Sequence, residues 1–185
     1  MRAGSRVASA FQAAQSWPAQ AGDIAGSICA PAGNDSEMAK VIISLDGLRP
    51  DAIDKFGAKT LQRLMREGTY TLNAQTILPS KTLPSHVSML TGVEPAVHGV
   101  TWNTDLTDEH GTLPVPTVFA IARQGGQHTA AFFSKAKFHH LQAPGSLDYT
   151  QAPARTRAPW GAVRTSEDAA WYIRRARPHL TFVHL

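Results

Sequence analysis

Two runs between Val41 and Gly92 decide the fold: Val41-Ile42-Ile43-Ser44-Leu45-Asp46-Gly47 and Lys81-Thr82-Leu83-Pro84-Ser85-His86-Val87-Ser88-Met89-Leu90-Thr91-Gly92. The first run is apolar and β-branched until it reaches Asp46, which is typical of a parallel strand buried on both faces. The second predicts a short helix over Pro84–Leu90, because proline favours a first turn and Gly92 follows the last. The pair predicts a strand that presents a carboxylate and a helix that begins beside a hydroxyl.

The rest of the chain alternates between the two kinds of periodicity. Apolar spacing predicts helices over Thr60–Glu67, Val115–Gln124 and Ser166–Arg177, and strands over His128–Phe133 and Thr181–Leu185. Between them we expect an extended segment over 70–78 and a lid-like loop region over 135–163. Strands that alternate with helices predict an α/β fold with a mainly parallel sheet, in which ligands bind at the carboxyl ends of the strands.

Composition limits the classes of site. With 185 residues, 43% of them hydrophobic and 17% charged, the chain has the composition of a globular domain. A single cysteine excludes a disulfide framework and a thiolate zinc site. Any metal must therefore be bound by Asp, Glu and His side chains.

Charge and hydropathy argue against nucleic-acid and membrane partners. The net charge of +4 is spread along the chain, and the Arg174–Arg177 cluster is better interpreted as a solvated helix end. No apolar run is long enough for a membrane span. Residues 8–21 are interrupted by Gln, Ser and Pro, so we expect no secretory signal and take the cytoplasm as the default compartment. The sequence does not indicate an oligomeric state.

The chain divides into two regions. Residues 1–37 are rich in Ala, Gly, Ser and Gln without a period, which predicts a disordered leader, or an upstream extension if translation begins at Met38. Residues 38–185 contain every predicted strand and helix and form the expected folded domain.

Asp46 has two interpretations. A carboxylate at the end of a buried strand is costly unless it is paired or bound to a metal, which favours a metal ligand. Asp-Gly also commonly marks a turn, so an ordinary turn residue before Gly47 is the alternative.

Thr82 has two interpretations as well. A hydroxyl at a helix N-terminus lies where the backbone N–H groups and the helix dipole favour anions, and a divalent metal there would make it a nucleophile. The alternative is a simple threonine N-cap. Lys81 is a candidate substrate-binding residue for a phosphate, or else a solvated loop lysine.

Asn103 is the third candidate, since its amide can donate to a phosphoryl oxygen; otherwise it is a turn residue. For His86, His98 and the His139-His140 pair, we favour hydrogen-bonded structural roles over metal ligation. The group Asp105, Asp108 and His110 looks like a polar loop.

Together these motifs resemble the alkaline phosphatase superfamily, and most closely its type I phosphodiesterase/nucleotide pyrophosphatase family. The matching residues are Ser44-Leu45-Asp46-Gly47-Leu48-Arg49-Pro50-Asp51, Pro79-Ser80-Lys81-Thr82-Leu83-Pro84-Ser85-His86, Thr91-Gly92, His98-Gly99 and Asn103. The resemblance covers about residues 39–185, and it is specific in the combination of motifs rather than in any one of them.

The resemblance implies a site with two divalent metal ions, expected to be zinc. Asp46 would bind one metal, Thr82 would be the nucleophile with its oxygen on the same metal, and Asn103 would hold a phosphoryl oxygen. The substrate would be a small phosphate ester, with nucleotides among the candidates. A sulfatase is disfavoured, because sulfatases carry a modified cysteine where this chain has Thr82.

The family's remaining metal ligands would follow a strand like Thr181–Leu185. We therefore expect the N-terminal part of an alkaline-phosphatase-like core, truncated and incomplete as a catalyst. Two alternatives stay open. One is an inactive remnant that binds an anion or a partner chain, and the other is a phosphomonoesterase or phosphonate hydrolase of the same superfamily.

Overall fold

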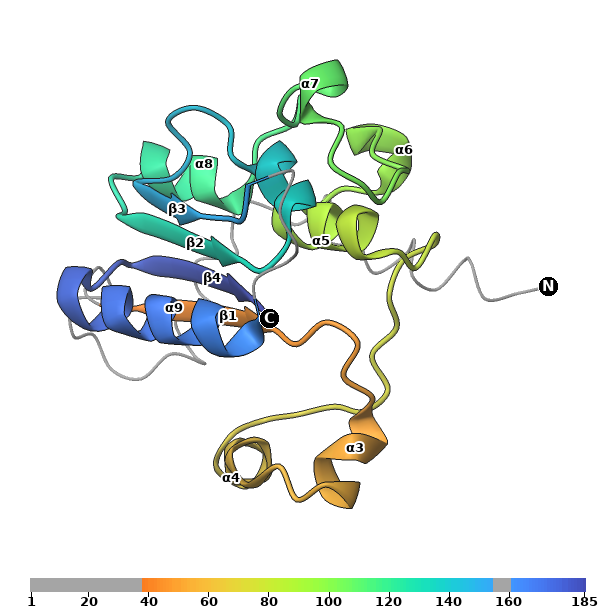
Figure 1. Cartoon of the computed structure of the whole chain (residues 1–185), viewed down its shortest axis with the longest axis vertical. Coiled ribbons are helices and arrows are strands. Elements are labelled where there is room, and N and C mark those ends of the chain that lie inside the picture. The colour runs from red at the N-terminus through yellow and green to blue at the C-terminus, as the bar shows by residue number, and fades with distance from the viewer. Residues whose placement is uncertain (1–37, 155–160) are drawn as a thin grey trace, which may run out of the picture.

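The computed structural model describes residues 38–154 and 161–185, so the expected leader lies outside the described residues. Its centre is a four-stranded sheet in the order β1-β4-β2-β3 (Figure 1). The strands are β1 (Lys40–Ser44), β2 (Thr129–Phe133), β3 (Tyr149–Gln151) and β4 (Leu180–His184). All neighbouring strands are parallel, which confirms the predicted α/β class.

The register aligns the carboxyl ends of three strands. Ser44 of β1 and Phe133 of β2 both pair with His184 of β4. The residues that follow β1 and β2, among them Asp46 and Lys135, therefore leave the sheet along one edge. Parallel sheets commonly bind ligands at this edge.

Alternation along the inner strands builds a core on each face of the sheet. In β2, Ala131 and Phe133 belong to one cluster of buried residues, whereas Ala130 and Phe132 belong to the other. Successive side chains of a strand point to opposite faces, so this division follows directly from the period of two.

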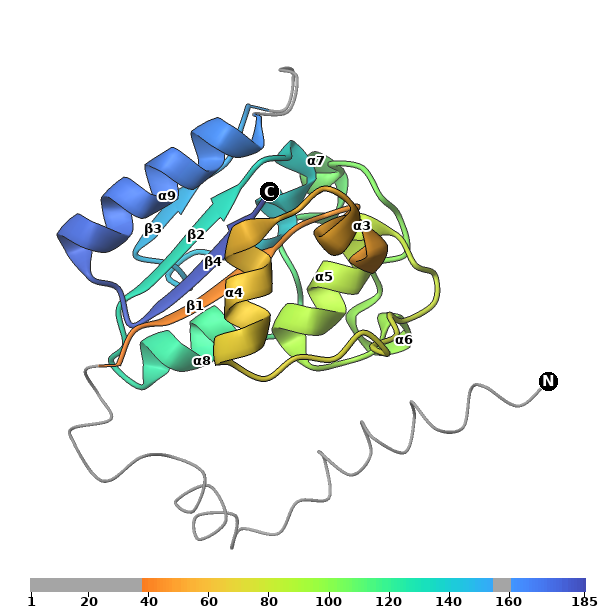
Figure 2. The ribbon, with the colours of Figure 1, turned by 90° about the horizontal axis from the view of Figure 1, so that it is seen from below.

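Helices cover both faces (Figure 2). One face carries α5 (Thr82–Thr91), α8 (Val118–Gln124) and the 3₁₀ helix η2 (Ala136–Leu141), and the opposite face carries α9 (Ala162–Ala176). Helix α5 has no Asp, Glu, Lys or Arg, and six of its ten residues are buried. It ends at Gly92, which adopts the left-handed conformation with φ of 74°.

Four short helices lie outside these layers: α3 (Pro50–Lys55), α4 (Lys59–Glu67), α6 (Pro95–His98) and α7 (Thr107–His110). Only α4 was expected from apolar spacing. Helices α3 and α4 extend from the sheet on two connecting segments (Figure 1), and neither has a buried residue. None of the helices in 38–154 and 161–185 has the length and apolar character needed to cross a bilayer.

The expectation that β1 is buried on both faces is wrong. Strand β1 is an edge strand with β4 as its neighbour, and Val41 and Ile43 are 43% and 57% exposed. An apolar run predicts a strand but does not say how many neighbours it has among the described residues. Strand β4, which lies between β1 and β2, is instead buried along its whole length.

Several boundaries also differ from the sequence predictions. Helix α8 begins at Val118 rather than Val115, because the Thr117 hydroxyl accepts from the Ala120 N–H and caps the helix. Helix α9 begins at Ala162, four residues before the expected start. The region expected to be a loop contains η2 and β3, while its residues 155–160 lie outside the described residues.

Candidate functional site

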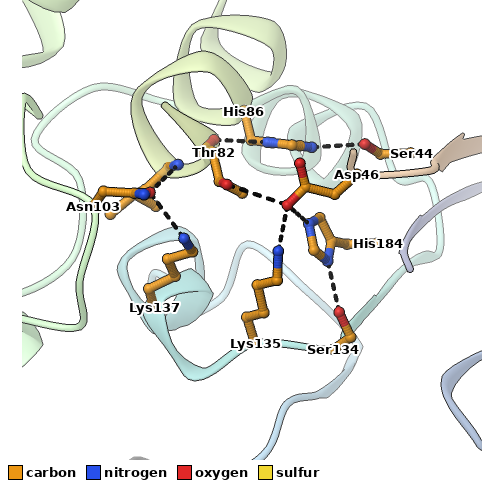
Figure 3. A network of polar contacts seen from close by, with 10 residues as sticks. Ser44, Asp46, Thr82, His86, Asn103, Ser134, Lys135, Lys137 and His184 are labelled. Carbon is orange, nitrogen blue, oxygen red and sulfur yellow. Dashed lines mark hydrogen bonds and ion pairs between the residues drawn. The ribbon is translucent and has the colours of Figure 1, made fainter. Parts of the chain in front are cut away.

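Asp46 and Thr82 meet at the carboxyl edge of the sheet (Figure 3). Asp46 follows β1, and Thr82 is the first residue of α5. The Thr82 hydroxyl donates to Asp46 Oδ2 over 3.1 Å. The N-terminus of α5 also directs its backbone N–H groups and the positive end of its dipole to this point, which favours an anion there.

Asn103 lies beside Thr82 and has a fixed orientation. Its Oδ1 accepts from the backbone N–H of Leu83 over 2.9 Å and from Lys137 Nζ over 2.8 Å. Both partners can only donate, so the oxygen of the amide is assigned without ambiguity. The amide nitrogen, with its N–H donors, must point the other way.

Two lysines carry positive charge to the same place. Lys135 follows β2 and donates to Asp46 Oδ2, and Lys137 in η2 donates to Asn103 (Figure 3). Burial lowers the pKa of Lys137, and the charge of Lys135 adds to this effect. A group that interacts with both ammoniums would most favourably be an anion.

Asp46 stays ionised although its side chain is only 23% exposed. Burial alone would raise the pKa of its carboxyl group. The hydrogen bond and charge of Lys135, together with the Thr82 hydroxyl and His184, outweigh burial and lower that pKa below its usual value.

His184 lies at the end of β4, fully buried between these groups. Its Nε2 is 3.5 Å from Asp46 Oδ2, and its Nδ1 is 2.9 Å from the Ser134 hydroxyl. Burial, followed by the effects of His86 and Lys135, lowers its pKa to about 4. His184 is therefore neutral near pH 7 and supports Asp46 as a dipole rather than as a charge.

His86 fixes the start of α5 to the end of β1. Its Nδ1 donates to the Thr82 carbonyl over 2.7 Å, so its Nε2 accepts from the Ser44 hydroxyl, also over 2.7 Å. Burial lowers the pKa of His86, which keeps the ring neutral. This is the structural role expected for His86, and it sets the distance between Asp46 and Thr82.

The other expected polar residues lie in supporting positions. His98 is buried, with Nε2 2.9 Å from the Ser88 hydroxyl and Nδ1 accepting from the Val100 N–H. Asp105 Oδ2 lies 2.8 Å from His139 Nδ1. These contacts join segments of the chain, in agreement with the structural roles that we expected for both histidines.

Lys81 is the exposed N-cap residue of α5. The ammonium groups that contact Asp46 and Asn103 come instead from Lys135 and Lys137, which the sequence analysis missed. A signal was present, because Ser134-Lys135-Ala136-Lys137 directly follows a predicted strand, at the edge where ligands bind.

The described residues fit part of a metal site. Asp46 Oδ2 and the Thr82 hydroxyl oxygen lie side by side and are both suitable metal ligands. The ammonium group of Lys135 already places one positive charge against Asp46 Oδ2. Among residues 38–154 and 161–185, however, no group of three or more His, Cys, Asp or Glu side chains could hold a metal ion. Two zinc ions with about four ligands each would need further donors.

The chain matches curated relatives over about a third of its length. The chain is 37% identical over 62 residues to human ectonucleotide pyrophosphatase/phosphodiesterase family member 1, a match that covers 32% of the chain and 7% of that protein. It is 33% identical over 70 residues to a bis(5'-adenosyl)-triphosphatase of Xenopus laevis, covering 38% of the chain and 16% of that protein.

A solved structure confirms the predicted fold. Phosphonoacetate hydrolase from Sinorhizobium meliloti 1021, in complex with phosphonoformate, superposes with a TM-score of 0.62 at 22% identity. The superposition covers 80% of this chain and 46% of the hydrolase. The chain thus spans less than half the length of the relatives that it matches, and it has the alkaline-phosphatase-like α/β fold.

The family assignment follows from a family model that matches more than half of the chain. The family model described as type I phosphodiesterase/nucleotide pyrophosphatase matches residues 40–166. This range contains Asp46, Thr82, Asn103 and both lysines of the site. The chain therefore belongs to the type I phosphodiesterase/nucleotide pyrophosphatase family.

Proposed function

We propose that this chain carries the nucleophile half of a metal-dependent phosphoric ester hydrolase of the phosphodiesterase/pyrophosphatase type. The observation that supports this most directly is the Thr82 hydroxyl, which donates to Asp46 at the N-terminus of α5 beside Asn103. A hydroxyl, an anion-favouring helix end and an amide donor are the groups that phosphoryl transfer requires.

Thr82 is the nucleophile in this proposal. After its proton passes to a solvent hydroxide ion, which becomes water, Thr82 Oγ attacks phosphorus, and the bond to the leaving oxygen breaks with the electron pair on that oxygen. Asn103 donates an amide N–H to a non-bridging oxygen, where negative charge accumulates. Water then attacks the phosphothreonine, which releases the phosphoryl product and restores the hydroxyl.

Asp46 and Thr82 would be two of the ligands of one divalent metal, which we expect to be zinc. The metal would lower the pKa of the threonine hydroxyl when bound. Asp46 is a poor proton acceptor in this role, because its own pKa is lowered. It instead orients the hydroxyl and supplies the negative charge that holds a cation.

The test is hydrolysis of bis(p-nitrophenyl) phosphate by the purified chain with added zinc. We expect weak turnover, because the described residues supply only part of a metal site. This turnover should be lost in Thr82→Ala and kept in the matched variant Thr91→Ala, because the Thr91 hydroxyl donates to the Val87 carbonyl at the far end of the same helix. Turnover that survives Thr82→Ala would contradict the proposal. Absence of both turnover and bound zinc would favour the alternative of an inactive domain that binds an anion or a partner.

The lysines support a second candidate, a phosphomonoesterase or phosphonate hydrolase. Lys135 and Lys137 place two ammonium groups at the site, which suits a substrate with more negative charge than a diester. The ratio of kcat/KM for p-nitrophenyl phosphate to that for the diester separates the candidates. We expect Lys137→Met to lower this ratio if the more highly charged substrate is the natural one, and to leave it unchanged otherwise.

A further inference from the structure

His140 connects η2 to the segment that carries Asn103. Its ring is buried at 1% exposure. The Nε2 atom accepts from the backbone N–H of Leu106 over 3.1 Å and from the indole N–H of Trp102 over 3.2 Å. On the opposite side of the ring, Nδ1 is 2.8 Å from the Gly111 carbonyl.

These partners determine the protonation of the ring. A backbone N–H and an indole N–H can only donate, and a carbonyl oxygen can only accept. His140 is therefore neutral, with its proton on Nδ1 and its lone pair on Nε2. The ring thus accepts hydrogen bonds at Nε2 and donates one at Nδ1. All three partners belong to the segment 102–111.

The position of Asn103 depends on hydrogen bonds of this kind. It lies one residue after Trp102, in an exposed segment without regular secondary structure between α6 and α7. Its amide is correctly aimed only while this segment stays beside α5 and η2. Two neighbours of His140 strengthen the same junction, since Lys137 donates to Asn103 and His139 lies 2.8 Å from Asp105.

We propose that His140 is a positioning residue for Asn103. By accepting from both Leu106 and Trp102, it holds the segment so that Asn103 Oδ1 caps the Leu83 N–H and the amide group stays at the start of α5. The importance of this alignment for catalysis rests on the proposed function. The alignment itself does not, and it can be measured in the whole chain without turnover.

Two amide variants separate the acceptor of His140 from its donor. His140→Gln keeps an acceptor near the place of Nε2, whereas His140→Asn keeps only a donor near the place of Nδ1. The readout is hydrogen exchange of the Leu83 amide, which Asn103 protects. We expect exchange about fivefold to tenfold faster in His140→Asn and nearly unchanged in His140→Gln. The Leu90 amide, inside the same helix, is the control and should stay protected in both.

Equal Leu83 exchange in the wild type and His140→Asn would overturn the proposal. If both variants fail to fold, Trp102→Phe replaces them, because it removes one donor and keeps a ring stacked on His110. It should speed Leu83 exchange by about twofold, and no change would overturn the proposal. A long-range proton–nitrogen NMR correlation of the wild type must also show the Nδ1–H tautomer of His140, and the Nε2–H tautomer would contradict it.

The diester assay gives a second test of the role of His140, independent of hydrogen exchange. In the diester assay we expect His140→Asn to lower kcat with little change in KM, and His140→Gln to restore most of kcat. A wild-type chain without turnover would count against the proposed function, while the exchange result would still decide the role of His140.

Discussion

At the scale of single residues, the charge of Asp46 depends mainly on Lys135. Both Lys135 and Thr82 donate to Asp46 Oδ2, at a carboxylate whose side chain is 23% exposed. Burial and the ammonium group act on the carboxyl pKa in opposite directions, and the ammonium group prevails. The same oxygen is the one that a divalent metal would need.

Lys135→Met should therefore raise the pKa of Asp46 relative to the wild type in the metal-free chain. Burial, which remains, disfavours the charged form once the ammonium is removed. A carbon NMR titration of the Asp46 carboxyl group measures this. Lys81→Met is the matched control and should leave the Asp46 titration where it was. An unchanged Asp46 pKa in Lys135→Met would show that the ion pair does not form.

The same pair makes a prediction for metal affinity. If Asp46 is a metal ligand, Lys135 competes with the metal for Oδ2, so Lys135→Met should bind zinc more tightly, by about threefold to tenfold. Isothermal titration of the metal-free chain with zinc measures the effect. Weaker zinc binding in Lys135→Met would mean that Asp46 is not the oxygen that the metal uses.

At the scale of elements, the site depends on how α5 is attached to the sheet. His86 joins α5 to β1 through Ser44, and its ring packs edge-on against Phe138 at 5.2 Å. His98 of α6 holds α5 at the other end through Ser88. The first residue of α5 is Thr82, so the position of the proposed nucleophile follows from these attachments.

His86→Ala should lower the free energy of unfolding by about 2–4 kcal/mol, because it leaves a cavity and unpaired polar groups. Urea unfolding measures the change. Met89→Ala lies on the same helix at a side chain that is 56% exposed, so it should cost less than about 0.5 kcal/mol. A cost below about 1 kcal/mol for His86→Ala would mean that other contacts hold α5 on β1.

The buried His98 side chain should make the folded chain less stable in acid. Burial lowers its pKa in the folded chain below the ordinary value of 6.5. Below pH 6.5 the unfolded state then binds a proton that the folded state does not, so stability falls with pH by up to about 1.4 kcal/mol per unit from this group. His98→Asn cannot titrate. Its urea stability should be lower at pH 7 but should fall less steeply toward pH 5, and parallel curves would contradict the assignment.

At the scale of the whole molecule, β1 leaves an apolar edge open. Val41, Ile42 and Ile43 are all more than a third exposed, and no strand among the described residues pairs with the outer edge of β1. Exposed apolar edges promote association. The sedimentation coefficient of the chain should therefore rise with concentration, and Ile43→Lys should suppress the rise. Val163→Lys, at a 70% exposed position on α9, should not. A concentration-independent coefficient in the wild type would contradict this.

The sequence predicted which segments form helices and strands better than it predicted how far those segments are buried. Strong periodicity identified α4, α5, α8, α9 and three of the four strands, because each has a clear apolar period. The burial of β1 was wrong, since a period does not reveal the number of neighbours. The short helices α3, α6 and α7 were missed, because one or two turns leave too little pattern.

The site shows the same limit. Asp46, Thr82 and Asn103 were chosen as a motif, and the structure brings them together. Whether they react is still a prediction. Lys135 follows β2, Lys137 lies in η2 and His184 ends β4. All three are far along the chain from Asp46, and their arrival at its side depends on the parallel register. Only the order of the strands in the sheet, which local patterns do not encode, makes them neighbours of β1.

The most direct test of the central claim is to look for phosphate on Thr82. The chain would be incubated with bis(p-nitrophenyl) phosphate and zinc, quenched in acid, and analysed by tandem mass spectrometry. We predict a phosphoryl adduct on Thr82 that needs zinc and is absent from Asp46→Asn, whereas Asp51→Asn, at a carboxylate paired with the exposed Arg49, retains it. Turnover without this adduct, or an adduct on another residue, would contradict the account.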